Sequence, residues 1–117
     1  GRNTLEFLRQ WEMAENPDFD DTACKELMQQ ARASSLTITP SLWVKRTQAI
    51  GITVKQGKGG DVTAHSEIAL DFHLWLDPAM RVTIVKIAGN EQMDISDLKA
   101  GHNLWMKKHF KRKYDLT

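Results

Sequence analysis

Residues 39–64 read TPSLWVKRTQAIGITVKQGKGGDVTA, and this stretch decides the fold. Thr39 followed by Pro40 is a strong helix start, because threonine caps the first turn and proline fits the first helical position. The helix is predicted to continue to about residue 48. Two β-branched runs around a glycine cluster follow over residues 50–64, and such a pattern is typical of a β-hairpin.

Two helices are predicted upstream of this stretch. Apolar residues at helical spacing indicate a first helix over residues 4–15, with Thr4 as its cap. A second helix is predicted over residues 21–34, where Asp20 or Asp21 is the expected N-cap.

Three more helices are predicted downstream, over residues 66–76, 78–87 and 95–114. His65 stands where it can cap the first of them. The second is so rich in apolar residues that we expect it to be mostly buried, although its β-branched residues weaken the helical prediction. The expected apolar face of the first consists of Ile68, Ala69, Phe72, Trp75 and Leu76.

The predicted fold is mainly α with one β-hairpin, an α+β arrangement of winged helix-turn-helix type in a single domain. A helix pair followed by a hairpin has this layout, with residues 21–48 as the pair and residues 50–64 as the wing. In such a module the second helix enters the major groove of DNA, where basic side chains meet base edges or phosphates.

The length and composition of the chain agree with one small globular domain. The chain has 117 residues, of which 41% are hydrophobic and 26% charged. Cys24 is the one cysteine, so no intrachain disulfide can form, which fits a reducing compartment. No apolar run approaches the roughly 20 residues that span a bilayer, so no membrane partner is expected. The abrupt start at Gly1-Arg2 suggests a piece of a longer chain.

The net charge is only +1, but the charges are unevenly distributed. Residues 36–65 hold four bases against one acid, and residues 101–117 hold five bases against one acid. The segments before and between them are acidic. The first basic zone coincides with the predicted helix and wing, and it also holds the candidate DNA contacts: Lys45, Arg46, Lys55, Gln56, Gly57, Lys58, Gly59, Gly60 and Thr63.

Each part of this set has an ordinary structural explanation beside the functional one. Glycines let a backbone approach a phosphate and lysines neutralise it, but a solvated flexible turn has the same composition. Lys45 and Arg46 also suit a charged solvent face. The basic tail is a candidate for secondary DNA contacts, for solubility or for binding an acidic partner; its residues are Lys107, Lys108, Lys111, Arg112 and Lys113.

Enzyme chemistry finds little support. The four histidines lack metal-ligand spacing and have no cysteine pair to join, and the glycine cluster lacks the form of a phosphate-binding loop. The paired carboxylates at Asp20-Asp21 and at Glu67 with Asp71 are better explained by a helix cap and a solvent face. We therefore expect no catalytic residue, no metal and no cofactor.

The chain resembles the KilA-N domain over residues 2–88, about three-quarters of its length. The resemblance rests on residues in the order and spacing typical of that family. They are Arg2-Asn3-Thr4-Leu5-Glu6-Phe7-Leu8, Trp11-Glu12, Asn16-Pro17-Asp18-Phe19, Trp43, Thr47, Ala49-Ile50-Gly51-Ile52, Lys55, Gly57, Gly59-Gly60, Thr63-Ala64-His65, Ile68-Ala69, Phe72 and Trp75.

This resemblance implies a DNA-binding domain related to the fungal APSES domains, of the kind found in phage or prophage regulatory proteins. It implies a KilA-N-like domain over 1–88 and a basic, helical extension over 89–117. Members of the family usually have a short strand-bearing segment before the position of Arg2, and we expect this chain to lack it. Lys58 and Asp61 stand where members often have an aromatic residue, and the Asp61 charge opposes phosphate binding.

The sequence thus predicts a cytoplasmic protein that binds double-stranded DNA through a helix-turn-helix and a glycine- and lysine-rich wing. The alternative is a protein-interaction or dimerisation module, either a homodimer or a complex with a partner protein, that has lost DNA affinity. An exposed apolar surface would favour that alternative.

Overall fold

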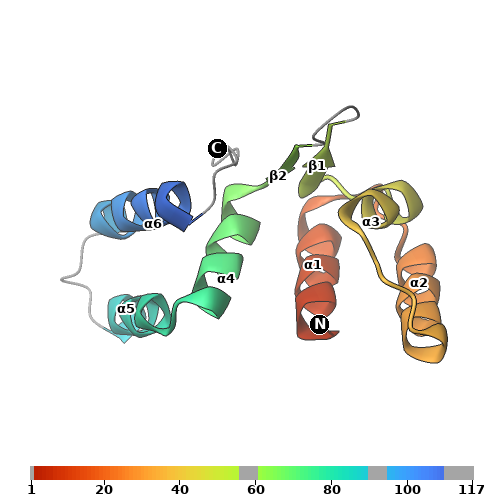
Figure 1. Ribbon diagram of the computed structural model, residues 1–117, viewed down its shortest axis with the longest axis horizontal. Helices are drawn as coiled ribbons and strands as arrows, with labels where there is room; N and C mark the ends of the chain where they lie inside the picture. Colours follow the sequence, from red (N-terminus) through yellow and green to blue (C-terminus); the bar gives the residue numbers. More distant parts are fainter. Residues whose placement is uncertain (1, 56–60, 90–94, 110–117) are drawn as a thin grey trace. The chain divides into compact units, whose positions relative to one another are not determined.

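The computed structural model describes residues 2–55, 61–89 and 95–109. The chain is mainly helical and carries one two-stranded antiparallel hairpin, which confirms the predicted fold class (Figure 1). It divides into two compact units, Gly1–Ala64 and His65–Thr117. The domain boundary predicted between residues 88 and 89 stays a prediction.

The first unit contains the helix pair and the hairpin in the predicted order (Figure 1). The helix predicted from Thr4 begins earlier, so Thr4 lies inside it and its prediction as a cap is wrong. The reason is that neither Arg2 nor Asn3 breaks a helix, and the helix extends through both. The elements are α1 (Arg2–Glu15), α2 (Asp21–Ser34), α3 (Pro40–Thr47), β1 (Ile52–Val54) and β2 (Val62–Ala64).

Side-chain caps fix where α2 and α3 begin. The Asp20 carboxylate accepts a hydrogen bond from Ala23 N at 2.9 Å, which confirms the predicted cap of α2. The Thr39 hydroxyl accepts one from Leu42 N at 3.1 Å, with Pro40 in the first turn of α3. Each cap satisfies a backbone N–H that has no partner within its own helix.

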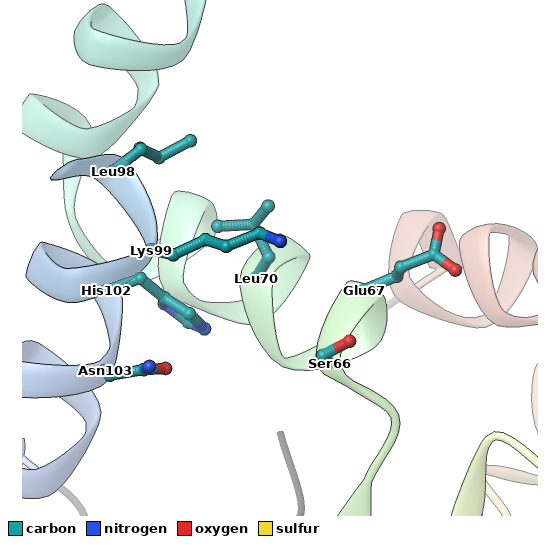
Figure 2. Close-up of a pocket in the computed structure, with 7 residues that line it drawn as sticks. All are labelled: Ser66, Glu67, Leu70, Leu98, Lys99, His102 and Asn103. Carbon is teal, nitrogen blue, oxygen red and sulfur yellow. The ribbon is translucent and has the colours of Figure 1, made fainter. Parts of the chain in front are cut away.

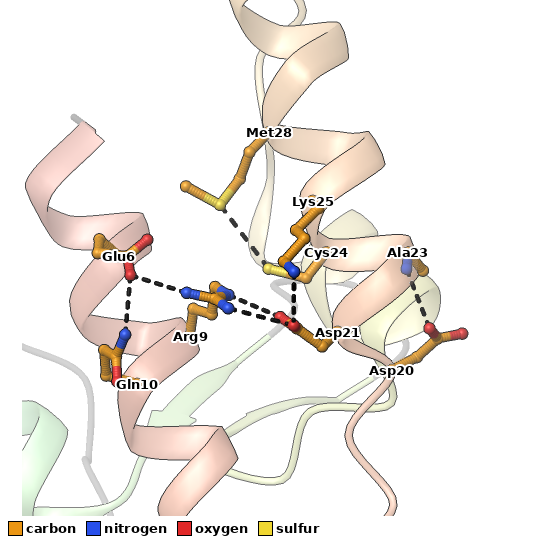
Figure 3. Close-up of polar contacts among 9 residues, drawn as sticks. All are labelled: Glu6, Arg9, Gln10, Asp20, Asp21, Ala23, Cys24, Lys25 and Met28. Atoms are coloured by element: carbon orange, nitrogen blue, oxygen red, sulfur yellow. Dashed lines mark hydrogen bonds and ion pairs between the residues drawn. The ribbon is translucent and has the colours of Figure 1, made fainter.

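Two kinds of contact join α1 to α2. Arg9 on α1 donates to both carboxylate oxygens of Asp21, from Nε at 2.6 Å and from Nη2 at 3.1 Å (Figure 3). This paired hydrogen bond holds the pKa of Asp21 below its usual range. Beside it, the core of the unit brings together residues of all three helices and of the segment after α3: Leu8, Cys24, Leu27, Met28, Trp43 and Ala49.

The buried thiol of Cys24 belongs to this core. It lies against Met28, with Sγ and Sδ 3.8 Å apart (Figure 3). Burial raises the pKa of Cys24 to about 11, so the thiol is protonated at neutral pH. Its role in the structure is that of a small apolar residue.

The second unit contains α4 (Ser66–Leu76), α5 (Pro78–Gly89) and α6 (Ile95–His109). As predicted, His65 caps α4, because its ring Nδ1 accepts from Glu67 N at 3.1 Å. The helix predicted over 95–114 is confirmed through residue 109, and its remainder lies outside the described residues. Among the helices of both units, as far as they are described, none has the length and apolar character needed to cross a membrane.

Two burial predictions for this unit are wrong. No residue of α5 is buried, although we expected most of that helix to be covered. On α4 the buried positions are Ile68, Ala69 and His73, whereas Phe72, Trp75 and Leu76 are exposed. Helical spacing identifies an apolar face, but it does not say how much of that face meets another helix.

Candidate functional site

The last turn of α3 carries the first basic candidates. Lys45 and Arg46 are exposed, as predicted, while Trp43 and Thr47 point into the core. The Thr47 hydroxyl donates to Trp43 O at 2.6 Å, so its polar atom is satisfied inside the helix. The helix therefore separates a buried face from a cationic one.

The hairpin carries the second group of candidates. Ile52 pairs with Ala64 and Val54 with Val62. Beyond the last pair, Lys55 N donates to Asp61 O at 2.9 Å, and both of these residues are exposed. The ladder thus places an acidic residue opposite Lys55 at the base of the tip.

Not every candidate of the wing falls on described residues. Thr63 lies in the middle of β2 and is half-buried, opposite Thr53. The tip candidates Gln56, Gly57, Lys58, Gly59 and Gly60 lie outside the described residues.

A short connector joins α3 to the hairpin. Gln48 ends α3 in a left-handed conformation, with φ of 57°, and its N–H donates to Val44 O. Ala49 is buried, Ile50 is exposed and Gly51 is buried, after which β1 begins. Because the connector is short and α3 packs on β1, Lys45, Arg46 and Lys55 belong to one unit.

A buried carboxylate from α1 holds this connector. Glu12 is 1% exposed. Its Oε2 accepts from Gly51 N at 2.7 Å, and its Oε1 accepts from Ile50 N at 3.0 Å. Asn16 Nδ2 donates to Glu12 Oε1 at 2.9 Å and also to Gln48 O at 2.9 Å. We call Glu12 and Asn16, with these bonds to the connector, the Glu12 clamp.

The sequence interpretation missed this clamp. Glu12 follows the core residue Leu8 by four positions on the first helix, and Asn16 follows Glu12 by four, directly after that helix ends. A carboxylate and an amide that continue an apolar stripe indicate buried polar groups, which need partners. That signal was available, but the partners are amides far along the chain, which no local pattern reveals.

The candidates for secondary DNA contacts lie in the other unit. Lys107 and Lys108 are exposed in the last turn of α6. Lys111, Arg112 and Lys113 lie outside the described residues.

The second unit holds a buried pair of histidines. His73 Nδ1 on α4 lies 2.6 Å from His102 Nδ1 on α6, and His73 Nε2 lies 3.2 Å from Asp77 Oδ2. Asp77 is an acceptor, so we assign the proton on His73 to Nε2; His102 Nδ1 then donates to His73 Nδ1. Trp105 stacks on His73 with ring centroids 3.8 Å apart.

This assignment leaves His102 Nε2 without a proton. The atom is buried, and among the described residues it has no hydrogen-bond partner. Burial lowers the pKa of His73, partly opposed by Asp77, and burial together with His73 lowers the pKa of His102. Both rings are therefore neutral at pH 7.

Beside His102 lies a pocket of about 300 Å³ between α4 and α6. The His102 ring extends from α6 toward α4, while the Glu67 carboxylate points away from it (Figure 2). Within the described parts of the chain, no three His, Cys, Asp or Glu side chains gather as a metal site. The pocket is lined by Ser66, Glu67, Leu70, Leu98, Lys99, His102 and Asn103.

Comparison with known proteins adds no relative. No family model, curated protein or solved structure matches this chain. The resemblance to the KilA-N domain therefore stays a prediction that rests on the residues quoted above.

Proposed function

We propose that this chain binds double-stranded DNA through α3 and the hairpin. The observation that carries the proposal is the placement of exposed Lys45 and Arg46 at the end of a helix that packs on the strand leading to exposed Lys55. A helix pair followed by a hairpin is the layout in which winged helix-turn-helix proteins bring a helix and a wing to one duplex.

The chemistry of the cationic residues fits phosphate contacts better than a catalytic task. Lysine and arginine neutralise phosphates and release condensed counterions, so binding of this kind weakens steeply as salt rises. The resemblance to the KilA-N domain supports the same function and suggests a phage- or prophage-type regulator of transcription. Such a protein would act in the cytoplasm of a bacterial cell or of a phage-infected host.

Removing the three cations tests the proposal. The triple variant Lys45→Ala, Arg46→Ala and Lys55→Ala should bind a random duplex more weakly at every salt concentration. Each lost phosphate contact lowers the slope of log affinity against log salt by about 0.9, so the slope should fall by about 2 to 3. Fluorescence anisotropy with labelled duplex and single-stranded DNA measures both quantities.

A matched control separates a defined site from net charge. Arg32, Lys86 and Lys99 are exposed and lie away from α3 and the hairpin along the chain. Replacing all three by alanine removes the same charge and should leave most of the affinity in place. Equal losses in the two triple variants, or no binding by the wild type, would contradict the proposal.

A second candidate function is self-association through the second unit. Apolar side chains are exposed on all three of its helices, and Val85 is 70% exposed. Surfaces of this kind mark interaction sites when they are contiguous. Within the described parts of the unit, the exposed large apolar residues are Phe72, Trp75, Leu76, Val82, Val85 and Leu104.

Sedimentation velocity over a range of concentrations tests this candidate. If copies of the chain pair through these side chains, Val85→Lys with Leu104→Lys should convert the dimer to a monomer. Met13→Lys alters an exposed apolar residue of the first unit and should leave the dimer intact. A wild-type chain that stays monomeric at all concentrations excludes the homodimer.

A further inference from the structure

We infer that Glu12 is the positioning residue of the DNA-binding surface, because it fixes the hairpin relative to α3. This inference rests on the proposed function for its consequence in DNA affinity. Among the described residues, Glu12 makes no hydrogen bond with Lys45, Arg46 or Lys55, and it acts through the connector between α3 and β1. Its side chain comes from α1, so the connector is held by an element outside both α3 and the hairpin.

The hydrogen bonds of the clamp reach both ends of the connector. Asn16 Nδ2 binds Gln48 O, at the end of α3. Glu12 binds Ile50 N and Gly51 N, directly before β1. A second tie runs from Asp20 N to Thr47 O at 2.9 Å, so the segment after α1 also holds the last residue of α3. Together these bonds leave the connector little freedom to rotate the hairpin against the helix.

The carboxylate of Glu12 indicates a role in orienting the connector more than a role in raising the free energy of unfolding. Transferring an ionised carboxylate out of water is unfavourable unless its oxygens are hydrogen-bonded. The partners of Glu12 that the structure describes are backbone and side-chain amides, with no cation among them. At a buried position, a well-packed apolar residue often stabilises the fold as much as a charged residue does. A carboxylate, unlike an apolar group, orients the N–H groups that it binds.

A DNA surface made of two groups needs this orientation. The helix and the wing bind one duplex as linked contacts, so each raises the effective concentration of the other. If the connector rotates freely, binding of the helix no longer places the wing next to the same duplex. The effective concentration of the second contact then falls, and so does the combined affinity. Loosening the clamp should therefore weaken DNA binding even while the first unit stays folded.

The test compares Glu12→Gln and Glu12→Ala with Glu15→Gln, an exposed glutamate on the same helix. Far-UV circular dichroism identifies a temperature at which all variants are folded. There, Glu12→Ala should bind duplex DNA about tenfold more weakly, with a smaller salt slope. Glu12→Gln keeps one acceptor oxygen and should recover part of the affinity, and Glu15→Gln should match the wild type.

Amide hydrogen exchange tests the Glu12 clamp in the absence of DNA. The N–H groups of Ile50 and Gly51 should exchange at least about tenfold faster in Glu12→Ala than in the wild type. Unchanged exchange at both amides overturns the clamp itself. If both amides exchange faster in Glu12→Ala but its DNA affinity is unchanged, the positioning role is overturned. A contact with a structural role alone would give that result. Failure of the wild type to bind any duplex overturns the proposed function and with it the role in affinity, while faster exchange would still support the clamp.

Discussion

Replacing Trp43 by alanine should destabilise the first unit by about 3 to 5 kcal/mol. The side chain is 2% exposed and belongs to the core between α2 and α3, with Phe19 6.0 Å away between ring centroids. Its removal leaves a cavity that neighbouring side chains fill only in part. Urea unfolding followed by circular dichroism, with amide exchange in α1 to α3, measures the loss.

Two further variants make this prediction specific. Trp43 Nε1 is buried and has no hydrogen-bond partner among the described residues, so Trp43→Phe removes an unpaired donor and should cost much less than Trp43→Ala. Trp75 is 60% exposed, and Trp75→Ala should change the free energy of unfolding by less than about 1 kcal/mol. A loss below 1 kcal/mol for Trp43→Ala would mean that the core is organised differently.

Mild acid should loosen the second unit while leaving the first folded. His73 and His102 have lowered pKa values in the folded chain, so the unfolded chain binds more protons below about pH 6.5. Stability is therefore complete above that pH and is lost as pH falls toward the lowered values. With two such groups, the loss is at most about 1.4 kcal/mol per pH unit for each.

The geometry of the histidine pair also predicts that the second unit loses stability as pH falls. Protonating both rings places two N–H groups against each other at the 2.6 Å contact between the Nδ1 atoms. Asp77 at the end of α4 favours protonation of His73 and offsets part of this effect, whereas His109 on α6 opposes protonation. On α5, Arg81 and Lys86 are exposed and offer no negative charge.

Variants of single histidines check the acid response. His102→Asn keeps an N–H donor toward His73 but does not titrate, so the change in stability between pH 7.5 and 5 should become about half as steep. His65→Asn alters the half-exposed cap of α4 and should leave the slope as it is in the wild type. Chemical denaturation followed by NMR signals of α4 and α6 measures the slope. The same slope in His102→Asn as in the wild type would exclude the histidine pair as its cause.

Local chemistry predicted most of the elements. The caps at Asp20 and Thr39 define the starts of α2 and α3, because a side-chain oxygen satisfies a nearby N–H without reference to the rest of the fold. The exposure of Lys45 and Arg46 follows from the same local periodicity once Trp43 is buried. The order of helices and hairpin was therefore readable from the sequence.

Burial in the second unit was not readable in this way. The expected apolar face of α4 is buried at Ile68 and Ala69 but exposed at Phe72, Trp75 and Leu76, whereas the polar side chain of His73 is buried. His73 is buried because its ring shares a hydrogen bond with His102 and stacks on Trp105, both on α6. Such partners come from distant parts of the chain, and a single helix gives no information about them.

The sequence by itself determined the helices, the hairpin and the uneven distribution of charge, since caps, periodicity and composition act over a few residues. Only the tertiary structure decided that a carboxylate on α1 holds the connector before β1, and that two histidines share a hydrogen bond across α4 and α6. Both depend on polar atoms that must find partners when they are buried, and folding brings those partners from far along the chain.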